Sequence, residues 1–489
     1  MKRGHVTLLL CLISSFGLLT TSAFAATPVV TVTSPANGSS KTSPVNYVAS
    51  ASSSCSKGIA AMRIYPSPGF NALTVNANKL NANINLPAGT YNTVVQAWDN
   101  CGGVGKTAVK ITVTGNRMPP PKFLFSSNYN ANKVNEYLIN ETSGAITPTS
   151  QGSVTVSGGP SRIAADKGGF RLYVAENNSK QLAAFFINRS NGSLSPVPGS
   201  PVSLGGGIPT SVAVAPSGKY VYVTTFNNNV AAFAVQSNGS LKPVPGSPFP
   251  TQVGPTWLVV DPSSSFVYVT DWRSDKLDAY TINKTNGALT PVPGEPYVPP
   301  NAGCSGCTLG GSAWGILTDR SGNFLIVPGY TDAGINVYRI DHTTGALSVV
   351  PGSPFIDRQV YGAGDIGPNT YIGTIDAENH FYFNYDSADN DIAIFTFNAT
   401  SGKLTLVSRS DQLVTNGGLC AGDQIEADPS GSFVYGIPGD MVQCATPNTG
   451  ALFGFSVNQA NGSLTNVPGS AFTFVHEAGP NLDGIAVTP

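Results

Sequence analysis

The sequence predicts an exported all-β protein in which a small β-sandwich precedes a seven-bladed β-propeller closed by N- and C-terminal strands. Three observations predict this fold. The chain begins with the pattern of an export signal, and short runs rich in Val, Ile and Thr alternate with Gly, Pro and Asn turns along the rest. One glycine turn also recurs seven times, which is typical of a repeat architecture.

The first segment has the form of a secretory signal peptide. Lys2 and Arg3 precede an apolar run from Val6 to Leu19, and the small residues Ala23 and Ala25 suit a cleavage site. We therefore assign residues 1–25 to the signal and expect a secreted, periplasmic or cell-surface protein. The apolar run is too short to cross a bilayer, so we expect no transmembrane segment.

Composition limits the possible partners. Charged residues make up 11 % of the chain, with 26 basic against 27 acidic side chains. Because positive and negative charges nearly cancel, we expect no long-range electrostatic field that would attract nucleic acid or an anionic membrane. We expect a monomer whose partner is a glycan, a small molecule or a protein.

Residues 26–115 are expected to form the β-sandwich. The runs Val29–Thr33 and Val109–Thr114 alternate in the manner of strands and are separated by turn-rich segments. Together with Ser34–Ser39 and Val95–Asp99, they resemble bacterial Ig-like modules of exported proteins. That resemblance implies a spacer or adhesion unit, with Cys55 and Cys101 paired within it. A Pro-rich linker follows at residues 116–121.

Residues 122–489 are expected to form the propeller. A glycine recurs two residues before a Leu or Ile, at intervals of 47 to 60 residues, which lie in the range of propellers and solenoids. The seven positions are Gly144, Gly192, Gly239, Gly287, Gly345, Gly402 and Gly462.

One repeat shows the composition of a blade. Runs at 210–215, 219–224, 230–235 and 240–246 predict four strands. Pro243 and Pro245 lie in the fourth run and cannot donate to a β-ladder, so this strand belongs on the outer edge. The chain enters the propeller with a second-strand sequence at Lys122 and leaves it with a first-strand sequence before Pro489. The two ends therefore complete one blade.

Antiparallel blades place the strand 4-to-1 loops and the 2-to-3 loops on one face, which we call the loop face. The extra residues of the later repeats fall there, in segments 297–311, 356–370, 411–423, 438–450 and 471–483. Since binding residues concentrate in long loops on a rigid scaffold, we expect the function on this face.

Six cysteines remain once the signal, with Cys11, is removed, and an even number in an exported chain favours disulfides. Cys420 and Cys444 both reach the loop face of one blade and are predicted to pair. Cys304 and Cys307 have the spacing of a redox or half-zinc motif, but no second pair accompanies them. A short structural disulfide is favoured.

A few polar residues are candidates for chemistry. His476 beside Glu477 lies on the loop face, as a functional pair or as ordinary loop residues, whereas His342 and His380 lie on the opposite face. Three carboxylates could bind calcium or form a solvated turn: Asp386, Asp389 and Asp391. No other cofactor is expected. The Gly362–Gly367 phrase lacks a following helix and predicts a flexible loop.

Aromatic and polar residues are predicted around the mouth of the central channel. They could hold a sugar-like ligand, although the tryptophans could equally fill the channel as core. The ligand-binding candidates are Arg162, Trp257, Arg273, Trp314, Tyr371, Asp423, Gln424 and Asp483.

The phrase from Trp257 to Tyr280, with its neighbours, resembles the lactonase family of seven-bladed propellers, which includes one type of 6-phosphogluconolactonase. The resemblance covers residues 122–489 and implies hydrolysis of a lactone. Asp271 and Asp275 match the family's Asp-x-Gly-x-Asp phrase, with Arg273 in place of its glycine. Where the family has histidines at inner-strand entrances, this chain has residues such as Trp257 and Trp314.

Two functional hypotheses follow. In the first, the propeller binds a ligand on its loop face and the Ig-like module serves as a spacer or adhesion unit. In the second, it is a hydrolase that acts on a lactone, with a carboxylate of the loop face or the loop histidine as base. The catalytic candidates of the second hypothesis are Asp271, Asp275, Glu426, His476 and Glu477.

Overall fold

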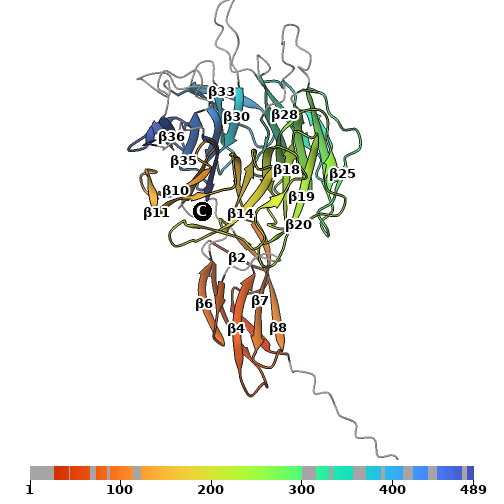
Figure 1. Cartoon of the computed structure of the whole chain (residues 1–489), viewed down its shortest axis with the longest axis vertical. Coiled ribbons are helices and arrows are strands. Elements are labelled where there is room, and N and C mark those ends of the chain that lie inside the picture. The colour runs from red at the N-terminus through yellow and green to blue at the C-terminus, as the bar shows by residue number, and fades with distance from the viewer. Residues whose placement is uncertain are drawn as a thin grey trace, which may run out of the picture.

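The computed structural model describes residues 27–42, 45–65, 73–84, 89–113, 123–271, 273–299, 315–329, 334–355, 370–386, 391–410, 422–438, 449–475 and 482–488. Within these ranges the protein is built of strands, turns and loops, and they contain no helix (Figure 1). No helix capable of crossing a membrane is found among them.

The amino-terminal unit consists of two sheets around one hydrophobic core. One has the order β1(Val29–Ser34), β3(Val45–Ser52), β6(Lys79–Ile84). The other has the order β2(Ser39–Lys41), β8(Val104–Val113), β7(Gly89–Asp99), β4(Ile59–Tyr65), β5(Leu73–Val75). Buried and exposed residues alternate along β3 and β8, because successive side chains of a strand point to opposite faces. Tyr47, Ile64 and Val95 meet in the core between the sheets.

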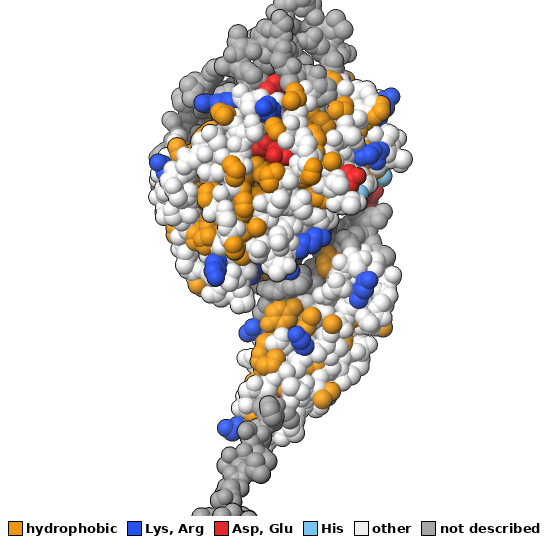
Figure 2. All heavy atoms as spheres, turned by 90° about the vertical axis from the view of Figure 1, so that its right-hand side faces the viewer, with side chains coloured by type: hydrophobic (Ala, Val, Ile, Leu, Met, Phe, Trp, Pro, Cys, Tyr) orange, Lys and Arg blue, Asp and Glu red, His pale blue; other side chains and the backbone are white. Residues whose placement is uncertain are grey.

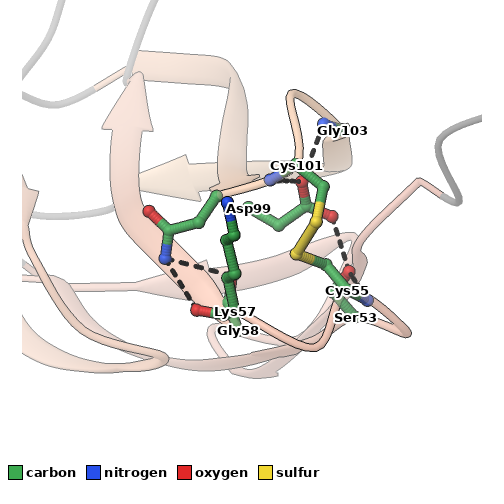
Figure 3. The surroundings of a disulfide bond; sticks show 8 residues. Ser53, Cys55, Lys57, Gly58, Asp99, Cys101 and Gly103 are labelled. Carbon is green, nitrogen blue, oxygen red and sulfur yellow. Dashed lines mark hydrogen bonds between the residues drawn. A yellow bond between two sulfur atoms is a disulfide. The ribbon is translucent and has the colours of Figure 1, made fainter.

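A disulfide joins Cys55, in the loop after β3, to Cys101, in the turn after β7 (Figure 3). The carboxylate of Asp99 organises both segments, since it accepts hydrogen bonds from the Ser53 hydroxyl and from the amides of Cys101 and Gly103. These hydrogen bonds lower the pKa of the Asp99 carboxyl group, and the bond from Ser53 has the largest effect. The pairing predicted for these two cysteines is present, and both sulfurs are committed to the bond.

The described strands of the larger unit form seven sheets, which we call blades one to seven. Blade one contains β39(Leu482–Thr488), β9(Phe123–Asn128), β10(Lys133–Ile139) and β11(Ile146–Thr155). Blade two contains β12(Pro160–Ala165), β13(Arg171–Glu176), β14(Gln181–Ile187) and β15(Leu194–Pro196), with β16(Val202–Ser203) paired to β14. Blade three contains β17(Pro209–Val214), β18(Tyr220–Thr225), β19(Asn229–Val235) and β20(Leu241–Pro243), with β21(Phe249–Pro250) paired to β19.

The remaining blades follow the same order. Blade four contains β22(Pro255–Val260), β23(Phe266–Asp271), β24(Lys276–Ile282) and β25(Leu289–Pro291). Blade five contains β26(Leu317–Thr318), β27(Phe324–Pro328), β28(Ile335–Ile340) and β29(Leu347–Val349). Blade six contains β30(Thr370–Ile375), β31(Phe381–Asp386), β32(Asp391–Phe397) and β33(Leu404–Arg409). Blade seven contains β34(Gly422–Ala427), β35(Phe433–Pro438), β36(Thr449–Val457) and β37(Leu464–Asn466), with β38(Phe472–Val475) paired to β36.

The first strand of each blade lies innermost around a central channel. At six of the seven junctions it contacts the first strand of the next blade, and between blades five and six the main contact joins β27 to β30. In blade one this inner strand is β39, which pairs antiparallel with β9 so that Thr488 lies opposite Phe123. Residues from the two ends of the propeller sequence therefore share one sheet. The chain enters and leaves the propeller at the same end of the channel.

The recurring glycine lies in the turn between the third and fourth strands. Gly144 and its six equivalents have φ between 74° and 87°, a left-handed conformation that glycine adopts without strain. In six blades a Cβ there would come closer than 3.0 Å to an aromatic ring at the start of the preceding blade's second strand, as for Gly192 against Phe123. The exception is Gly239 in blade three. Blade two has Arg171 where the other blades have the aromatic ring, and a Cβ on Gly239 would meet the ring of Phe186 instead. The repeat thus marks a contact between blades.

Buried aspartates organise the turns between first and second strands. Asp376 accepts hydrogen bonds from the amides of His380 and Phe381, and Asp428 accepts one from Phe433. Asp166, Asp261 and Asp319 do the same in their own blades. These carboxylates satisfy backbone donors and are structural.

Candidate functional site

A cavity of about 310 Å³ lies at the end of the channel where the inner strands finish. This volume is at the lower end of the range for small-molecule sites. Its walls come from the last residues of β12, β17, β22, β26, β34 and β39 and from the turns that follow. The lining residues are Ala165, Asp166, Lys167, Val214, Pro216, Val260, Pro262, Thr318, Asp319, Arg320, Glu426, Ala427, Pro429 and Val487.

Three charged side chains other than the turn aspartates line this cavity. Glu426 projects from β34, Lys167 follows β12 and Arg320 follows β26. The guanidinium of Arg320 is anchored, since Nη2 donates to the carbonyl oxygen of Ile375 at 2.9 Å and Nε to that of Asp376 at 3.3 Å. Lys167 and Arg320 keep exposed surface although protein surrounds them, so the cavity is open to water.

The surroundings shift the pKa values of this group. Burial raises the pKa of the Glu426 carboxyl to about 8, against the smaller lowering effects of the Val487 amide and the Arg320 charge. Burial, together with the nearby charge of Arg320, lowers the pKa of Lys167. The raised pKa of Glu426 lies closer to neutral pH, in a cavity that is also lined by the cationic side chain of Arg320. A carboxyl group and a cation in one cavity can serve general acid–base catalysis and the stabilisation of a developing negative charge.

Glu426 was expected at the loop face, and that placement is wrong. β34 runs from Gly422 to Ala427, so the side chain lies near its carboxyl end and faces the opposite cavity. Gln424, nearer the start of the strand, is fully engaged with the backbone of Ile485. Its Nε2 donates to the Ile485 carbonyl oxygen and its Oε1 accepts from the Ile485 amide.

Trp257 and Arg162 meet inside the channel. The guanidinium carbon of Arg162 lies 4.5 Å from the centre of the Trp257 ring, a cation–π contact. Trp257 also packs against one core cluster of blades four and five and against another of blades six and seven. Trp257 therefore contacts residues of several blades from its inner strand, and its part in ligand binding stays a prediction.

Asp271 and Asp275, which match the Asp-x-Gly-x-Asp phrase of the lactonase family, differ in burial. Asp271 ends β23 and is completely buried. Asp275 lies in the following turn with φ of 55° and is half-buried, while Arg273 is exposed and packs over Gly254. Asp391, one of the suggested calcium ligands, forms an ion pair of 2.7 Å with Arg409.

Several predicted residues lie outside the described part of the structure, and their roles stay predictions. They are Trp314, Asp389, His476, Glu477, the segment 362–367, and the cysteines Cys304, Cys307, Cys420 and Cys444. The strands that contain Tyr371, Asp386, Asp423 and Asp483 are described, but these side chains are not. His342 and His380 lie in turns away from the loop face, where His342 contacts Asn323 and His380 contacts Glu378.

Lys167 and Arg320 were missed as candidates, although the repeats contain a signal for them. The signal is the residue that directly follows the turn aspartate, or follows Ala215 in the blade that lacks this aspartate. It is proline in three blades, at Pro216, Pro262 and Pro429. In two other blades the same position is occupied by Lys167 and Arg320. Glu426, similarly, stands where the other described blades have residues such as Ala164 or Val259. Comparison of equivalent positions would have singled out all three.

The surface agrees with the balanced composition. On the face that Figure 2 presents, basic and acidic side chains are scattered among uncharged and hydrophobic ones, without a large patch of one sign.

Comparisons with known proteins agree on the propeller. Residues 119–304 match the model of the family described as "Lactonase, 7-bladed beta-propeller". None of the curated protein sequences compared with the chain matches it significantly.

Solved structures share the fold at low sequence identity. A candidate 6-phosphogluconolactonase from Bacteroides fragilis NCTC 9343 has 15 % identity and a TM-score of 0.58, over 76 % of this chain and 98 % of that one. Its counterpart from Bacteroides uniformis ATCC 8492 has 15 % identity and a TM-score of 0.59, over 76 % and 100 %. The periplasmic gluconolactonase of Pseudomonas aeruginosa has 16 % identity and a TM-score of 0.54, over 75 % and 99 %.

Proposed function

We propose that this chain is an exported lactonase of the seven-bladed β-propeller family and that it hydrolyses a lactone in the channel cavity. The observation that carries the proposal is the convergence of Glu426, Arg320 and Lys167 in a cavity of about 310 Å³. The match of residues 119–304 to the lactonase family supports the same reaction class.

In the proposed mechanism Glu426 acts as general base. Its carboxylate takes a proton from a water molecule, whose oxygen attacks the lactone carbonyl carbon. The resulting tetrahedral oxyanion is stabilised by the anchored Arg320 and by Lys167. The ring C–O bond then breaks, and the leaving alkoxide takes the proton back from Glu426. The product is the hydroxy acid, and no group other than water is consumed.

Two features support a sugar-derived lactone as substrate. The structural relatives include a gluconolactonase and candidate 6-phosphogluconolactonases. The cavity is lined by polar and apolar residues. Among them are the cationic side chains of Lys167 and Arg320, which would attract a carbonyl oxygen or an anionic substituent of the substrate. We take the amino-terminal sandwich as an Ig-like spacer and the compartment as periplasmic or extracellular, in keeping with the signal sequence.

The test is an assay of the purified chain on gluconolactone, on its 6-phosphorylated form and on a panel of other lactones. Spontaneous hydrolysis is measured in the same buffer and subtracted. We expect Glu426→Gln to lower kcat/KM by about 10²- to 10⁴-fold, the contribution of a positioned base. Arg320→Met is expected to lower kcat as well. Glu141→Gln, which changes an exposed carboxylate in the blade-one turn, is the matched control.

Two results would contradict the proposal. One is the absence of turnover above buffer on every lactone by a folded protein. The other is full activity in Glu426→Gln, which would remove this cavity as the site. Ligand binding on the loop face, the other hypothesis from the sequence, has no specific support among the described residues.

A further inference from the structure

The charges of the chain are unevenly divided between its two units. Residues 27–113 contain six basic side chains and one acidic side chain, whereas residues 123–489 contain 16 basic and 26 acidic ones. The near balance of the whole chain therefore conceals a basic sandwich joined to an acidic propeller. On the side of the sandwich that Figure 2 presents, basic side chains are visible and acidic ones are not. Charge asymmetry between parts of a chain indicates that one part meets a charged partner.

The one acidic residue of the sandwich, Asp99, does not neutralise the basic side chains. It is 5 % exposed. Its carboxylate accepts hydrogen bonds from the Ser53 hydroxyl and from the amides of Cys101 and Gly103, beside the disulfide (Figure 3). The carboxylate is therefore committed to the loops that the disulfide joins.

Three of the basic side chains share the outer face of the five-stranded sheet. Met62 and Ile64 point into the core, so Arg63 between them points outward. The register places Arg63 opposite Gln96 of β7, and Gln96 opposite Lys106 of β8. Paired residues of a sheet project from the same face. Arg63, Gln96 and Lys106 therefore form one row across three strands.

A second row lies further along the same face. Asn92 of β7 is opposite Lys110 of β8, and both are exposed. Strand geometry separates the backbone positions of Arg63 and Lys106 by about 10 Å and those of Lys106 and Lys110 by about 14 Å. None of the outward-pointing residues of β4, β7 and β8 is acidic. The spacing of the three cations suits an extended partner better than a single small anion.

Arg63 is oriented by an aromatic side chain. Its guanidinium carbon lies 4.9 Å from the centre of the Trp98 ring, a cation–π contact. Trp98 follows Gln96 by two residues on β7, so it lies diagonally opposite Arg63 on the outer face. The buried Nε of Arg63 has no hydrogen-bond acceptor among the described residues. The sheet thus presents an oriented guanidinium, whose planar set of donors matches a carboxylate.

We propose that this outer face binds a polysaccharide that carries carboxylate groups, with Arg63 as the main contact and Lys106 and Lys110 as further charges. The amides of Gln96 and Asn92 can donate to sugar hydroxyls and accept from them. The sandwich then anchors the protein to an acidic glycan instead of serving only as a spacer. This role is separate from the channel cavity and does not depend on the proposed function.

Other polyanions fit this face less well. Double-stranded DNA carries one charge per about 1.7 Å of its axis, and an anionic membrane attracts clusters of about four to eight basic residues. The outer face has three cations, about 10 Å or more apart along the backbone positions given above. Sparse cations with amide side chains between them match a chain of hydroxyl groups in which carboxylates are spaced apart.

Binding of alginate, a polysaccharide that carries carboxylate groups, tests the proposal on the full-length mature protein. Calorimetric titration measures the dissociation constant, with dextran as the uncharged polymer and with double-stranded DNA and vesicles of anionic phospholipid in parallel. We expect saturable binding of alginate and none of dextran. The dissociation constant should rise with NaCl concentration, because salt screens the exposed charges.

Variants of the sandwich show which face binds. Arg63→Met keeps an apolar contact with Trp98 but removes the charge, and should raise the dissociation constant for alginate at least about tenfold. The double variant Lys106→Gln, Lys110→Gln changes only exposed side chains, so it is expected to fold and to bind more weakly. Lys79→Gln removes an exposed cation from β6 of the other sheet and should leave binding unchanged. Thermal unfolding midpoints verify that each variant is folded.

Four results would overturn the proposal. The wild-type protein could bind alginate no better than dextran, or bind DNA or vesicles more tightly than alginate. Folded Arg63→Met could bind as well as the wild type, or Lys79→Gln could lose as much affinity as the double lysine variant. All four are binding measurements, so they stand apart from the outcome of the lactone assay.

Discussion

The hydroxyl group of Tyr435 donates a 2.8 Å hydrogen bond to the carbonyl oxygen of Gly144, a residue 291 positions away in the chain. Tyr222 makes the same bond to Gly287, and Tyr268 to Gly345, each from one blade to the next. Blade seven is therefore attached to blade one through the contact that joins consecutive blades. This relationship leads to the first two predictions.

Replacing Tyr435 with Phe removes the hydrogen bond and leaves a buried carbonyl without its partner. We expect the free energy of unfolding to fall by about 1–3 kcal/mol. Urea denaturation followed by tryptophan fluorescence measures the change. Tyr129→Phe removes an exposed hydrogen bond to Asn178 and should cost much less. Equal losses in the two variants would show that the bond to Gly144 has no special weight.

Gly144→Ala combines two penalties that can be separated. The residue has φ of 74°, and a Cβ would collide with the ring of Phe433. Gly218 has φ of 68°, but a Cβ there would meet nothing within 4 Å. We expect Gly218→Ala to lose about 1 kcal/mol through the backbone alone. Gly144→Ala should lose about 1–3 kcal/mol more through overpacking. Similar unfolding midpoints in denaturant for both variants would contradict the packing explanation.

The pH dependence of lactone hydrolysis should follow Glu426. A general base acts when it is deprotonated, and burial raises the pKa of this carboxyl to about 8. We expect kcat/KM, after subtraction of spontaneous hydrolysis, to rise about tenfold per pH unit below pH 8 and to level off above it. A profile that is flat between pH 5 and pH 8 would exclude Glu426 as the base.

The same carboxyl group should make stability depend on pH. Its pKa is raised in the folded protein above the ordinary 4.5, so the folded state holds the proton more tightly than the unfolded state. The resulting stabilisation is complete below pH 4.5 and is lost as pH rises through 8. We expect Glu426→Gln to lose less stability than the wild type between pH 5 and pH 9. Unfolding midpoints at several pH values measure this, and parallel curves for the two proteins would refute it.

The blade pattern could be predicted from the sequence because its signals are local and repeated. Gly144 and its equivalents mark the turns, and Pro243 identifies an outer strand, as the order of blade three shows. The position of Glu426 could not be fixed in this way. Whether a residue faces one end of the channel or the other depends on strand bounds to within about two residues, where sequence patterns are weakest.

Two further features depend on register and on long-range packing. Lys167 and Arg320 follow turn aspartates and have the sequence pattern of exposed turn residues, yet they line the cavity because the inner strands converge there. Arg63, Gln96 and Lys106 share a row only because β4, β7 and β8 pair as they do. Comparing each blade with the others identifies the cavity residues, since the repeats act as references for one another.

The position of Trp257 has a consequence for how the blades are joined. Its indole ring contacts Arg162 of blade two and packs against core clusters of blades four to seven. One side chain therefore links blades that are not neighbours in the ring, so a change at this position reaches parts of the chain that are distant in sequence.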